Sequence, residues 1–329
     1  MKIGIIGLGF MGATHLGAFS KLKDVEVAAV CARNPQALSG DLSHVGGNLN
    51  REAGVYDFSN VRKYTDWREI VRDPALDAID ICLPTDAHLA VSLAAFAEGK
   101  HVLCEKPMAL STSDCERMIA AAESHRRIFM VGQVLRFWPE YLYLENFVKS
   151  ERRSIVSATF SRRAAMPDWN PWLMDESRSG GAILDLLIHD IDQALSLFGR
   201  PEQVSAKSLE GSDSMTATLT YADGLQVRIE GGWFGAETPF SMGFAAQARE
   251  RELDFTAEGL RLNATKVELP AAEDAYEAEL AYFIECCQNN RQPDRCLPRD
   301  SAEGVELALL LKQSRSLEGT PLKCKIQKT

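Results

Sequence analysis

The sequence predicts an α/β protein made of two parts. Short runs rich in Val and Ile alternate with helical stretches over about the first 130 residues, which predicts a doubly wound parallel sheet. A glycine-rich loop directly follows the first of these runs, at the carboxyl end of a strand, where such sheets bind their ligands. Beyond about residue 133, segments of alternating polarity predict an α+β domain with a mainly antiparallel open sheet. We therefore expect one domain over residues 1–132 and a second over 133–329.

The strands of the first part are expected to be buried on both faces, because their apolar residues run without polar alternation. These strands are expected at residues 2–7, 25–30, 78–83, 101–104 and 128–131. Between them, apolar residues recur at the spacing of a helix that covers a sheet. The corresponding helices are expected at residues 12–22, 67–72, 86–98 and 112–124.

The second part mixes helices with alternating strands. Helical spacing is seen at residues 139–149, 180–198, 274–288 and 301–314. Strict alternation over residues 215–221 and 225–231 is typical of strands with one buried face. No Gly/Ser-rich linker separates the two parts, so we expect them to pack directly against each other.

Composition excludes several classes of protein. The 36 basic and 46 acidic residues give a net charge of −10, and no basic run offers a surface to nucleic acid. Hydrophobic residues make up 46% of the 329, enough for globular cores, but no apolar stretch is long enough to span a bilayer. The eight cysteines lack CxxC spacing and paired histidines, so we expect free thiols, no metal and a cytoplasmic location.

The segment GLGFMG at residues 7–12 matches the G-x-G-x-x-G pattern between a strand and a helix. The first glycine permits a tight turn, the second lets a pyrophosphate approach the backbone, and the third lets the helix pack closely. The helix N-terminus would then present unpaired N–H groups to the phosphates. We expect a Rossmann domain that binds a dinucleotide, the alternative being a purely structural turn. The residues expected to contact the cofactor here are Gly7, Gly9, Phe10, Met11 and Gly12.

The end of the second strand is expected to distinguish NADP from NAD. An acidic residue there would bind the ribose 2′-hydroxyl, whereas an arginine accommodates a 2′-phosphate. The sequence has Arg33 and no acidic residue between residues 31 and 34, which favours NADP. The alternative is that Arg33 is a solvated surface residue and that the backbone holds the ribose.

A charged pair, Glu105 and Lys106, follows directly after the buried strand at residues 101–104. Ligands of open α/β sheets bind at this edge, so the Lys106 amine is placed to donate to a substrate oxygen. Pro107 restricts the backbone of Lys106 to an extended conformation. An ordinary ion pair at the end of a strand is the alternative.

The stretch after Gly180 and Gly181 is expected to form one nearly buried helix that carries Asp185 and His189 four residues apart, on one face. Burial of an unpaired carboxylate or imidazole costs several kcal/mol, so these side chains need partners or a cavity with substrate. A core histidine satisfied by Asp185 or by Asp192 is the alternative.

Taken together, these motifs resemble those of the Gfo/Idh/MocA oxidoreductases, which include inositol dehydrogenases and glucose–fructose oxidoreductase. The resemblance covers the whole chain in order and spacing. It is carried by the loop at residues 7–12, by Glu105-Lys106-Pro107, and by Gly180-Gly181-(x)3-Asp185-(x)3-His189-(x)2-Asp192. The chain departs from many members at Leu187, where they have glycine, and this departure bears on the substrate class.

The resemblance implies an NAD(P)-dependent dehydrogenase or reductase that acts on a secondary alcohol or ketone of a sugar, cyclitol or other polyol. It implies that His189 is the general acid/base, that Lys106 polarises the reacting oxygen, and that Asp185 hydrogen-bonds the substrate. It also implies further cofactor contacts from Leu83, Pro84, Thr85, His88, Glu105 and Lys106.

Two further residues are candidates for substrate binding. Arg136 could hold a substrate hydroxyl or carboxylate, or else form an ion pair between the domains. Trp172 offers an aromatic face to the C–H side of a sugar ring, as does Trp169, unless both pack at a domain or subunit contact.

Two other functions remain open at this point: a non-catalytic cofactor-binding regulator of the same fold, and a redox-assisted lyase or glycosidase with a tightly held nucleotide. The presence of both Lys106 and His189 disfavours the regulator. The expected partners are a small polyol substrate and a second copy of the chain, in a homodimer or homotetramer formed through the C-terminal sheet.

Overall fold

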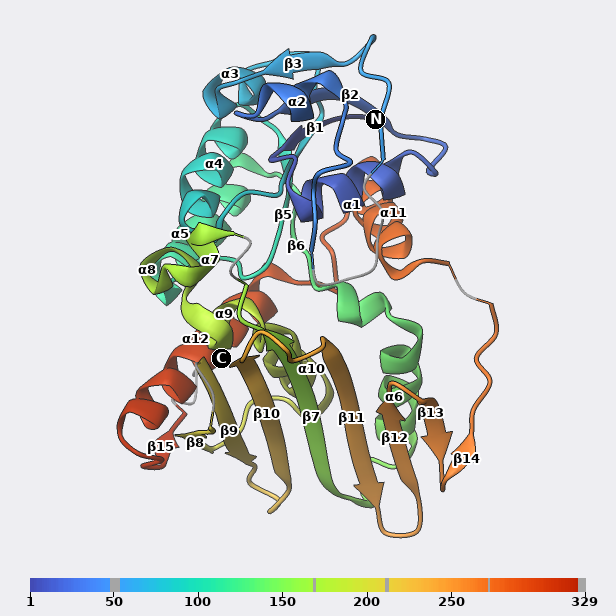
Figure 1. The fold of residues 1–329 in the computed structure, drawn as a ribbon, viewed down its shortest axis with the longest axis vertical. Helices are drawn as coiled ribbons and strands as arrows, with labels where there is room; N and C mark the ends of the chain where they lie inside the picture. Colours follow the sequence, from blue (N-terminus) through green and yellow to red (C-terminus); the bar gives the residue numbers. More distant parts are fainter. Residues whose placement is uncertain (48–53, 168–169, 211–212, 272, 325–329) are drawn as a thin grey trace. The chain divides into compact units, whose positions relative to one another are not determined.

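The computed structural model describes residues 1–47, 54–167, 170–210, 213–271 and 273–324. The chain divides into two compact units (Figure 1). The first contains Met1–Phe137 together with Glu273–Ala302, and the second contains Trp138–Ala272 together with Glu303–Thr329. The later segment Glu273–Ala302 thus belongs with the N-terminal part, which the sequence patterns did not indicate.

The first unit is built on a six-stranded sheet of order β3-β2-β1-β4-β5-β6, and every pair in it is parallel. The strands are β1 (Lys2–Ile6), β2 (Glu26–Cys31), β3 (Arg62–Tyr64), β4 (Ala78–Ile81), β5 (His101–Cys104) and β6 (Phe129–Val131). The chain leaves β1 toward β2 and β3 and then returns to the other side of β1 at β4. The expected doubly wound sheet is therefore confirmed, and its topological switch point lies between β1 and β4.

Several helices of this unit begin at a residue whose side chain caps the first turn. Ser111 accepts from the Asp114 N–H at 3.1 Å at the start of α5, and Asp274 accepts from the Tyr276 N–H at 3.0 Å at the start of α11. Helix α11 packs against α1. The helices are α1 (Phe10–Phe19), α2 (Pro35–Ser39), α3 (Trp67–Val71), α4 (Thr85–Ala97), α5 (Thr112–His125), the 3₁₀ turn η1 (Val134–Phe137) and α11 (Ala275–Gln288).

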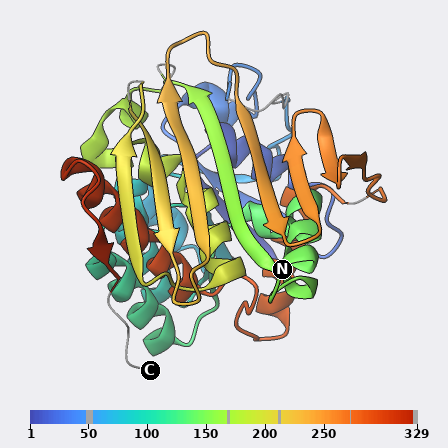
Figure 2. The ribbon, with the colours of Figure 1, turned by 90° about the horizontal axis from the view of Figure 1, so that it is seen from below.

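The second unit is built on a nine-stranded sheet of order β14-β13-β12-β11-β7-β10-β9-β8-β15 (Figure 2). Only β7 and β10 pair in parallel, so the expected mainly antiparallel sheet is confirmed. The central strand β7 was not among the expected strands. The strands are β7 (Ile155–Ala165), β8 (Gln203–Ser208), β9 (Asp213–Thr220), β10 (Gln226–Phe234), β11 (Ser241–Ala248), β12 (Glu252–Thr256), β13 (Gly259–Leu262), β14 (Thr265–Lys266) and β15 (Leu322–Lys323).

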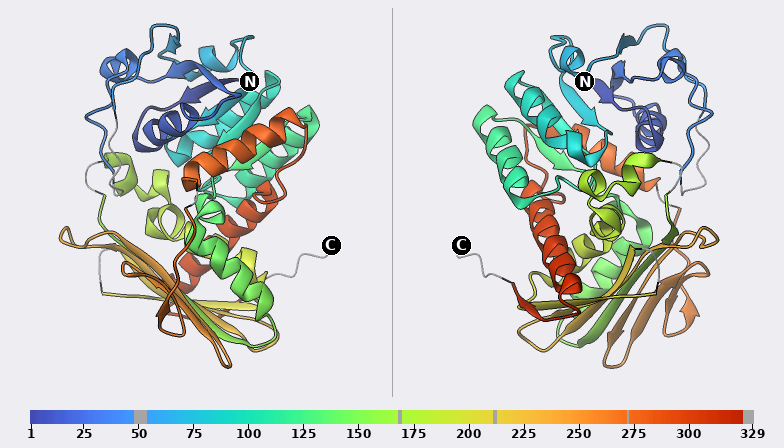
Figure 3. Two further views of the ribbon diagram at one scale, coloured as in Figure 1. Left: turned by 90° about the vertical axis from the view of Figure 1, so that its right-hand side faces the viewer. Right: turned by 60° about the vertical axis from the view of Figure 1, so that its left-hand side comes forward.

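Helices cover one face of this sheet (Figure 3). Helix α10 packs on β7 and β10, and α6 packs on β12. Among the described elements, none lies on the opposite face. The helices are α6 (Pro139–Ser150), α7 (Pro171–Met174), α8 (Glu176–Ser179), α9 (Gly181–Asp185), α10 (Ile188–Phe198) and α12 (Pro298–Ser316).

The expectation of one continuous helix over residues 180–198 is wrong. The segment is divided into α9 and α10, with Leu186 and Leu187 between them. The N–H groups of Leu186 and Leu187 both donate to the Ala182 carbonyl at 2.9 Å. The second of these bonds spans five residues, as in a single π-helical turn, and interrupts the regular α-helical ladder.

No helix within the described ranges is long and apolar enough to cross a bilayer. The eight cysteines are free thiols, and all except Cys82 are buried.

Candidate functional site

The register of the parallel sheet brings the predicted cofactor residues of the first unit to one edge. The Gly7 N–H donates to the Cys31 carbonyl at 2.9 Å, and the Glu105 N–H donates to the Ile81 carbonyl at 3.0 Å. The glycine loop, the segment after β4 and the Glu105–Lys106 pair therefore follow the carboxyl ends of neighbouring strands. This edge of an open α/β sheet is where ligands bind.

The three glycines of the loop have different steric surroundings. A Cβ atom on Gly7 would lie 2.4 Å from the Cys82 carbonyl oxygen, and one on Gly12 would lie 1.9 Å from the Gly7 oxygen. A Cβ atom on Gly9, by contrast, would meet nothing within 4 Å among the described residues. Gly7 also has a φ of 98°, which favours glycine. Gly7 and Gly12 are thus required by the fold, whereas Gly9 leaves space for a ligand.

Helix α1 begins directly at this space. Gly9 is its N-cap, and no side chain of the described residues caps the first turn. Phe10 and Met11, which form that turn, are partly exposed. Backbone N–H groups at a helix N-terminus bind phosphate, so the loop fits the pyrophosphate of a dinucleotide.

Arg33 lies exposed two residues beyond the end of β2. The next residue, Asn34, caps α2 by accepting from the Gln36 N–H at 2.9 Å. Among the described residues, no hydrogen bond or ion pair engages the Arg33 guanidinium. The position suits contact with the adenosine ribose, and the exposure equally suits a solvated side chain.

His88 connects the segment after β4 to the segment after β5. Its imidazole Nε2 lies 2.9 Å from the Leu83 carbonyl oxygen, and its Nδ1 lies 3.0 Å from that of Pro107. Burial lowers the pKa of His88 below its ordinary value. Pro84 is the N-cap of α4, and Thr85 is its first residue. His88 therefore holds the backbone on either side of the predicted cofactor residues.

Below the sheet edge lies a buried group of ionisable side chains that connects three elements. His15 of α1 donates from Nδ1 to Asp80 Oδ2 at 2.9 Å, and its Nε2 lies 3.1 Å from Glu105 Oε1, within ion-pair distance. Glu105 Oε2 in turn accepts from the Lys106 N–H at 3.1 Å. The side chains of His15 and Asp80 are fully buried, and that of Glu105 is 7% exposed. The Lys106–Pro107 peptide bond is cis.

The charges in this group are mutually dependent. Burial would lower the pKa of His15, but the Asp80 carboxylate and the neighbouring Cys82 raise that pKa well above its usual value. Burial would raise the pKa of Glu105, but the hydrogen bond and charge of His15, with the charge of Lys106, hold that pKa below its usual value. The raised pKa of His15 and the lowered pKa of Glu105 both favour a charged imidazole beside an ionised Glu105.

This arrangement does not suit a metal ion, although His15, Asp80 and Cys82 lie close enough together to hold one. Nδ1 donates to Asp80 and Nε2 faces the Glu105 carboxylate at 3.1 Å, so both imidazole nitrogens are directed at carboxylates rather than at a metal. Burial and the Asp80 charge raise the pKa of the Cys82 thiol, which opposes formation of the thiolate that a metal requires.

The second unit carries Asp185 and His189. Asp185 is the last residue of α9, and His189 is the second residue of α10. Both side chains are partly exposed, whereas Leu187, between them, is fully buried. Leu187 therefore packs in the core of this unit rather than at its surface.

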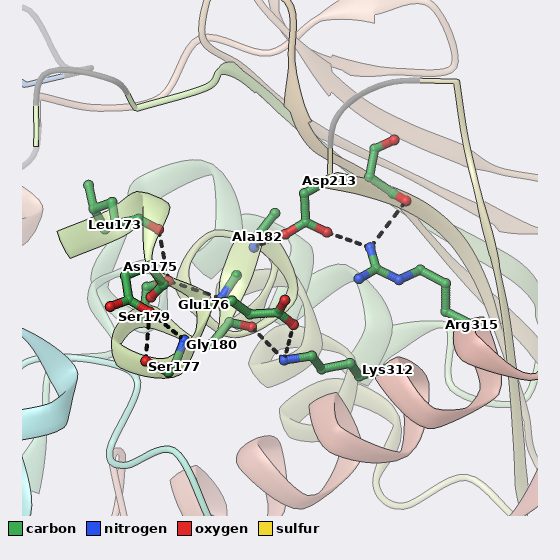
Figure 4. A network of polar contacts seen from close by, with 12 residues as sticks. Leu173, Asp175, Glu176, Ser177, Ser179, Gly180, Ala182, Asp213, Lys312 and Arg315 are labelled. Carbon is green, nitrogen blue, oxygen red and sulfur yellow. Dashed lines mark hydrogen bonds and ion pairs between the residues drawn. The ribbon is translucent and has the colours of Figure 1, made fainter. Parts of the chain in front are cut away.

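A network of polar contacts fixes the start of α9 (Figure 4). Asp213 accepts from the Ala182 N–H at 2.6 Å and from Arg315 Nη1 at 2.5 Å. Lys312 pairs with Glu176 at 2.6 Å and donates to the Gly180 carbonyl at 3.2 Å. Two cations of α12 thus hold the turn that leads to Asp185.

A buried ion pair fixes the start of α10. Arg162 of β7 donates from Nε and Nη2 to the two carboxylate oxygens of Asp190 at 2.8 and 3.2 Å. Burial raises the pKa of Asp190, while the Arg162 charge opposes that rise. Because Asp190 follows His189 directly, this pair fixes the backbone at His189.

The remaining substrate candidates differ in their surroundings. Arg136 is buried in the first unit, where Nη1 donates to the Arg295 carbonyl and pairs with Asp300 at 3.0 Å. These contacts favour a structural ion pair within this unit over substrate binding. Trp172 of α7 is partly exposed, and Trp169 lies outside the described residues.

Sequence reasoning missed His15 and Asp80. One signal was present: Asp80 is a lone carboxylate within the apolar strand Ala78–Ile81, and a buried acid requires a partner. Nothing in the sequence indicated that this partner would be His15 of α1, 65 residues earlier in the chain. Lys106 belongs to the first unit and His189 to the second.

Comparison with known families gives matches in both units. The model described as "Oxidoreductase family, NAD-binding Rossmann fold" (GFO_IDH_MocA) matches residues 1–133. A second one, the "GFO/IDH/MocA C-terminal domain", matches residues 153–246. Together they cover more than half of the chain.

Individual proteins give a consistent result. The chain is 29% identical to inositol 2-dehydrogenase of Salmonella typhimurium over 194 residues, 58% of this chain and 53% of that protein. It is 30% identical to myo-inositol 2-dehydrogenase of Thermotoga maritima over 213 residues, 64% and 58% of the two chains. The matched part thus spans little more than half of these relatives.

A solved structure of levoglucosan dehydrogenase, in complex with NADH and levoglucosan, shares the fold along the whole chain. The TM-score is 0.82 and the identity 19%, with 99% of each chain covered.

Proposed function

Because the chain belongs to the GFO/IDH/MocA family of oxidoreductases, we propose that it transfers a hydride between a nicotinamide cofactor and a secondary alcohol or ketone of a sugar, cyclitol or related polyol. One observation carries the proposal. The open space at Gly9 and the Glu105–Lys106 pair lie at the carboxyl edge of the same parallel sheet. A dinucleotide loop and a strand-end amine at one sheet edge are what such a reaction requires.

Three side chains are proposed to act on the substrate. His189 takes the hydroxyl proton during oxidation and returns it during reduction, a role that suits imidazole near neutral pH. The Lys106 ammonium stabilises negative charge that develops on the same oxygen. Asp185 accepts a hydrogen bond from the substrate. The partial exposure of all three side chains supports these roles.

The cofactor is proposed to lie along the carboxyl edge of the first sheet. The N–H groups at the start of α1 would bind its pyrophosphate, and Gly9 would leave room for it. The segment Leu83–Pro84–Thr85, braced by His88, and the Glu105–Lys106 pair would contact its nicotinamide half.

Arg33 is proposed to favour NADP over NAD through the 2′-phosphate. The levoglucosan dehydrogenase complex contains NADH, so NAD is the competing possibility. The test compares kcat/KM for the two cofactors in the wild type, in Arg33→Ala and in the control Arg117→Ala, an exposed arginine of α5. We expect Arg33→Ala alone to weaken use of NADP by about tenfold or more. A wild type that strongly prefers NAD contradicts this assignment.

The proposed reaction is tested with a panel of myo-inositol, levoglucosan and related polyols, by the absorbance of the reduced cofactor at about 340 nm. Lys106→Met should abolish turnover and leave cofactor affinity nearly unchanged, whereas Lys63→Met, an exposed lysine of β3, should change neither. Normal kcat in Lys106→Met overturns the assignment. Cofactor binding without turnover would indicate a regulator, and a product formed without net reduction of cofactor would indicate a lyase or glycosidase.

Trp172 is proposed to face the C–H side of a sugar ring. Trp172→Ala should raise KM for the polyol several-fold, with a smaller effect on kcat. An unchanged KM would contradict this contact and favour a role for Trp172 in packing.

The uncovered face of the nine-stranded sheet is proposed to pair two or four copies of the chain (Figure 2). Light scattering during gel filtration measures the mass in solution. A chain that is monomeric at micromolar concentration contradicts this proposal.

A further inference from the structure

We propose that His15 is a positioning residue for the reaction: its imidazolium holds the Glu105 carboxylate, which fixes the main chain at Lys106. This inference rests on the proposed function, in which Lys106 acts on the substrate oxygen. His15 itself is not proposed to touch substrate or cofactor.

The contacts form a continuous chain from the glycine loop to Lys106. His15 lies on α1, the helix that begins at the loop, and its Nε2 lies 3.1 Å from Glu105 Oε1. The other carboxylate oxygen of Glu105 accepts from the Lys106 N–H at 3.1 Å. The helix proposed to bind phosphate is thereby connected to the proposed catalytic amine through one side chain.

A second partner fixes the imidazole itself. Asp80 of β4, in the middle of the sheet, accepts from His15 Nδ1 at 2.9 Å. The hydrogen bond at Nδ1 ties the ring to β4, and Nε2 on its other side faces the Glu105 carboxylate at ion-pair distance. The same pattern, in which a carboxylate orients a histidine that acts on a further group, recurs in enzyme sites.

Burial makes the imidazolium necessary to this arrangement. Two carboxylates that are fully or almost fully buried cannot both remain ionised without a nearby cation. The groups that face the imidazole are Asp80, Cys82 at 3.5 Å, Glu105, and the Tyr276 ring of α11 at 6.3 Å between centroids. None of these four groups can supply positive charge, so the cation between the two carboxylates is the imidazole itself, while the Lys106 charge adds to its effect at Glu105.

Loss of His15 would therefore act at Lys106. With Lys106 as the remaining cation, the Glu105 carboxylate would be held less firmly, would take up a proton more readily or turn away, and the Lys106 N–H would lose its charged acceptor. Displacement of a reacting group by about 1 Å costs on the order of 100-fold in rate. The glycine loop would remain, because its geometry depends on Gly7 and Gly12 rather than on His15.

The experiment compares His15→Gln, Glu105→Gln, the double variant and Lys106→Met, with His101→Gln as the matched control. His101 begins β5, at the opposite end of the strand from Lys106, and its Nδ1 accepts from the Ile128 N–H at 2.9 Å. Two quantities are measured for each variant. One is kcat with whichever polyol of the panel proves to be a substrate, and the other is the Kd of the reduced cofactor, from its fluorescence.

We expect His15→Gln to lower kcat by about 10- to 100-fold with cofactor Kd changed less than threefold, and the double variant to be no worse than the worse single variant. His101→Gln should retain kcat within twofold. Additive losses in the double variant, or kcat within twofold in His15→Gln, overturn the positioning role. If Lys106→Met keeps its turnover, the proposed function fails instead, and the two failures are thus distinguishable.

A second measurement uses the wild-type protein alone, so it needs no substrate and does not depend on whether a variant folds. The ring nitrogens of the six histidines can be followed by NMR in the wild-type protein between pH 6 and pH 8. We expect His15 to keep protons on both nitrogens throughout this range. A His15 ring that is neutral at pH 7 overturns the proposal whatever the kinetics.

Discussion

The backbone N–H of Leu187 donates to the carbonyl of Ala182, five residues earlier, at 2.9 Å. This bond lies at the junction of α9 and α10, so Asp185 and His189 are on opposite sides of the break. The extra residue in the turn directs Leu186, Leu187 and their neighbours into the core and leaves both ionisable side chains partly exposed. Single π-helical turns of this kind occur frequently at functional sites.

Replacement of Leu187 by alanine should destabilise the fold strongly. Leu187 is fully buried, so Leu187→Ala leaves a cavity and is expected to cost about 2–5 kcal/mol of unfolding free energy. Leu187→Met nearly conserves volume and should cost less than about 1.5 kcal/mol. Urea unfolding measures both. Equal small losses in the two variants would show that Leu187 is not tightly packed.

Position 181 requires glycine for two reasons: its backbone is left-handed, and a side chain there would clash. It has a φ of 76°, and a Cβ atom there would lie 2.7 Å from Asp213 Oδ2, the oxygen that accepts from the Ala182 N–H. Gly181→Ala should therefore cost about 1–3 kcal/mol, through backbone strain and loss of that hydrogen bond. Gly235→Ala is the control, because a Cβ at Gly235 meets nothing within 4 Å and its φ is not positive. Thermal unfolding measures the stability of both variants, and we expect the lower melting temperature for Gly181→Ala. Similar melting temperatures for the two variants would contradict the prediction.

Gly9 should separate cofactor binding from folding. A side chain at Gly9 projects into open space, so Gly9→Ala and Gly9→Val should keep the wild-type melting temperature within a few degrees. The same side chain would occupy the space proposed for the pyrophosphate, and cofactor Kd should rise at least tenfold. Gly12→Val should instead lose stability, because its Cβ would lie 1.9 Å from the Gly7 oxygen. Normal cofactor affinity in Gly9→Val would argue against a dinucleotide at this loop.

The sequence predicted the parts of the fold that depend on local pattern. Continuous Val and Ile runs identified strands such as Ala78–Ile81, and the glycine spacing identified the loop before α1. It did not predict the break at Leu187, because the apolar residues there satisfy a regular helix equally well. Nor did it predict β7, whose parallel pairing with β10 joins residues about 70 positions apart.

In the candidate site, too, local features could be predicted from the sequence and long-range contacts could not. Glu105 and Lys106 were recognisable because a charged pair directly follows a buried strand. The contact of Glu105 with His15 joins residues 90 positions apart in the sequence, and no spacing rule connects them. Long-range partners of buried charges have to be read from the structure.

The pH dependence of stability should reveal the charge on His15. Its pKa is raised well above the ordinary value, mainly by the Asp80 carboxylate acting against burial, and Cys82, Glu105 and the Tyr276 ring face it as well. Below about pH 6.5 both the folded and the unfolded chain hold the proton, and the contribution to stability is complete. As the pH rises above this value, only the folded chain keeps the proton, so the unfolding free energy falls by up to about 1.4 kcal/mol per pH unit until the raised pKa is passed.

The measurement is urea unfolding of the wild type and of His15→Gln between pH 6 and pH 8. The difference in unfolding free energy between the two proteins should shrink steadily over this range, because the variant lacks the titrating ring. The range ends at pH 8 because burial raises the pKa of the Cys82 thiol, which adds a slope of the same sign at higher pH. A constant difference between the two curves would mean that His15 is neutral in the folded protein, which would leave Lys106 as the cation that acts on Glu105.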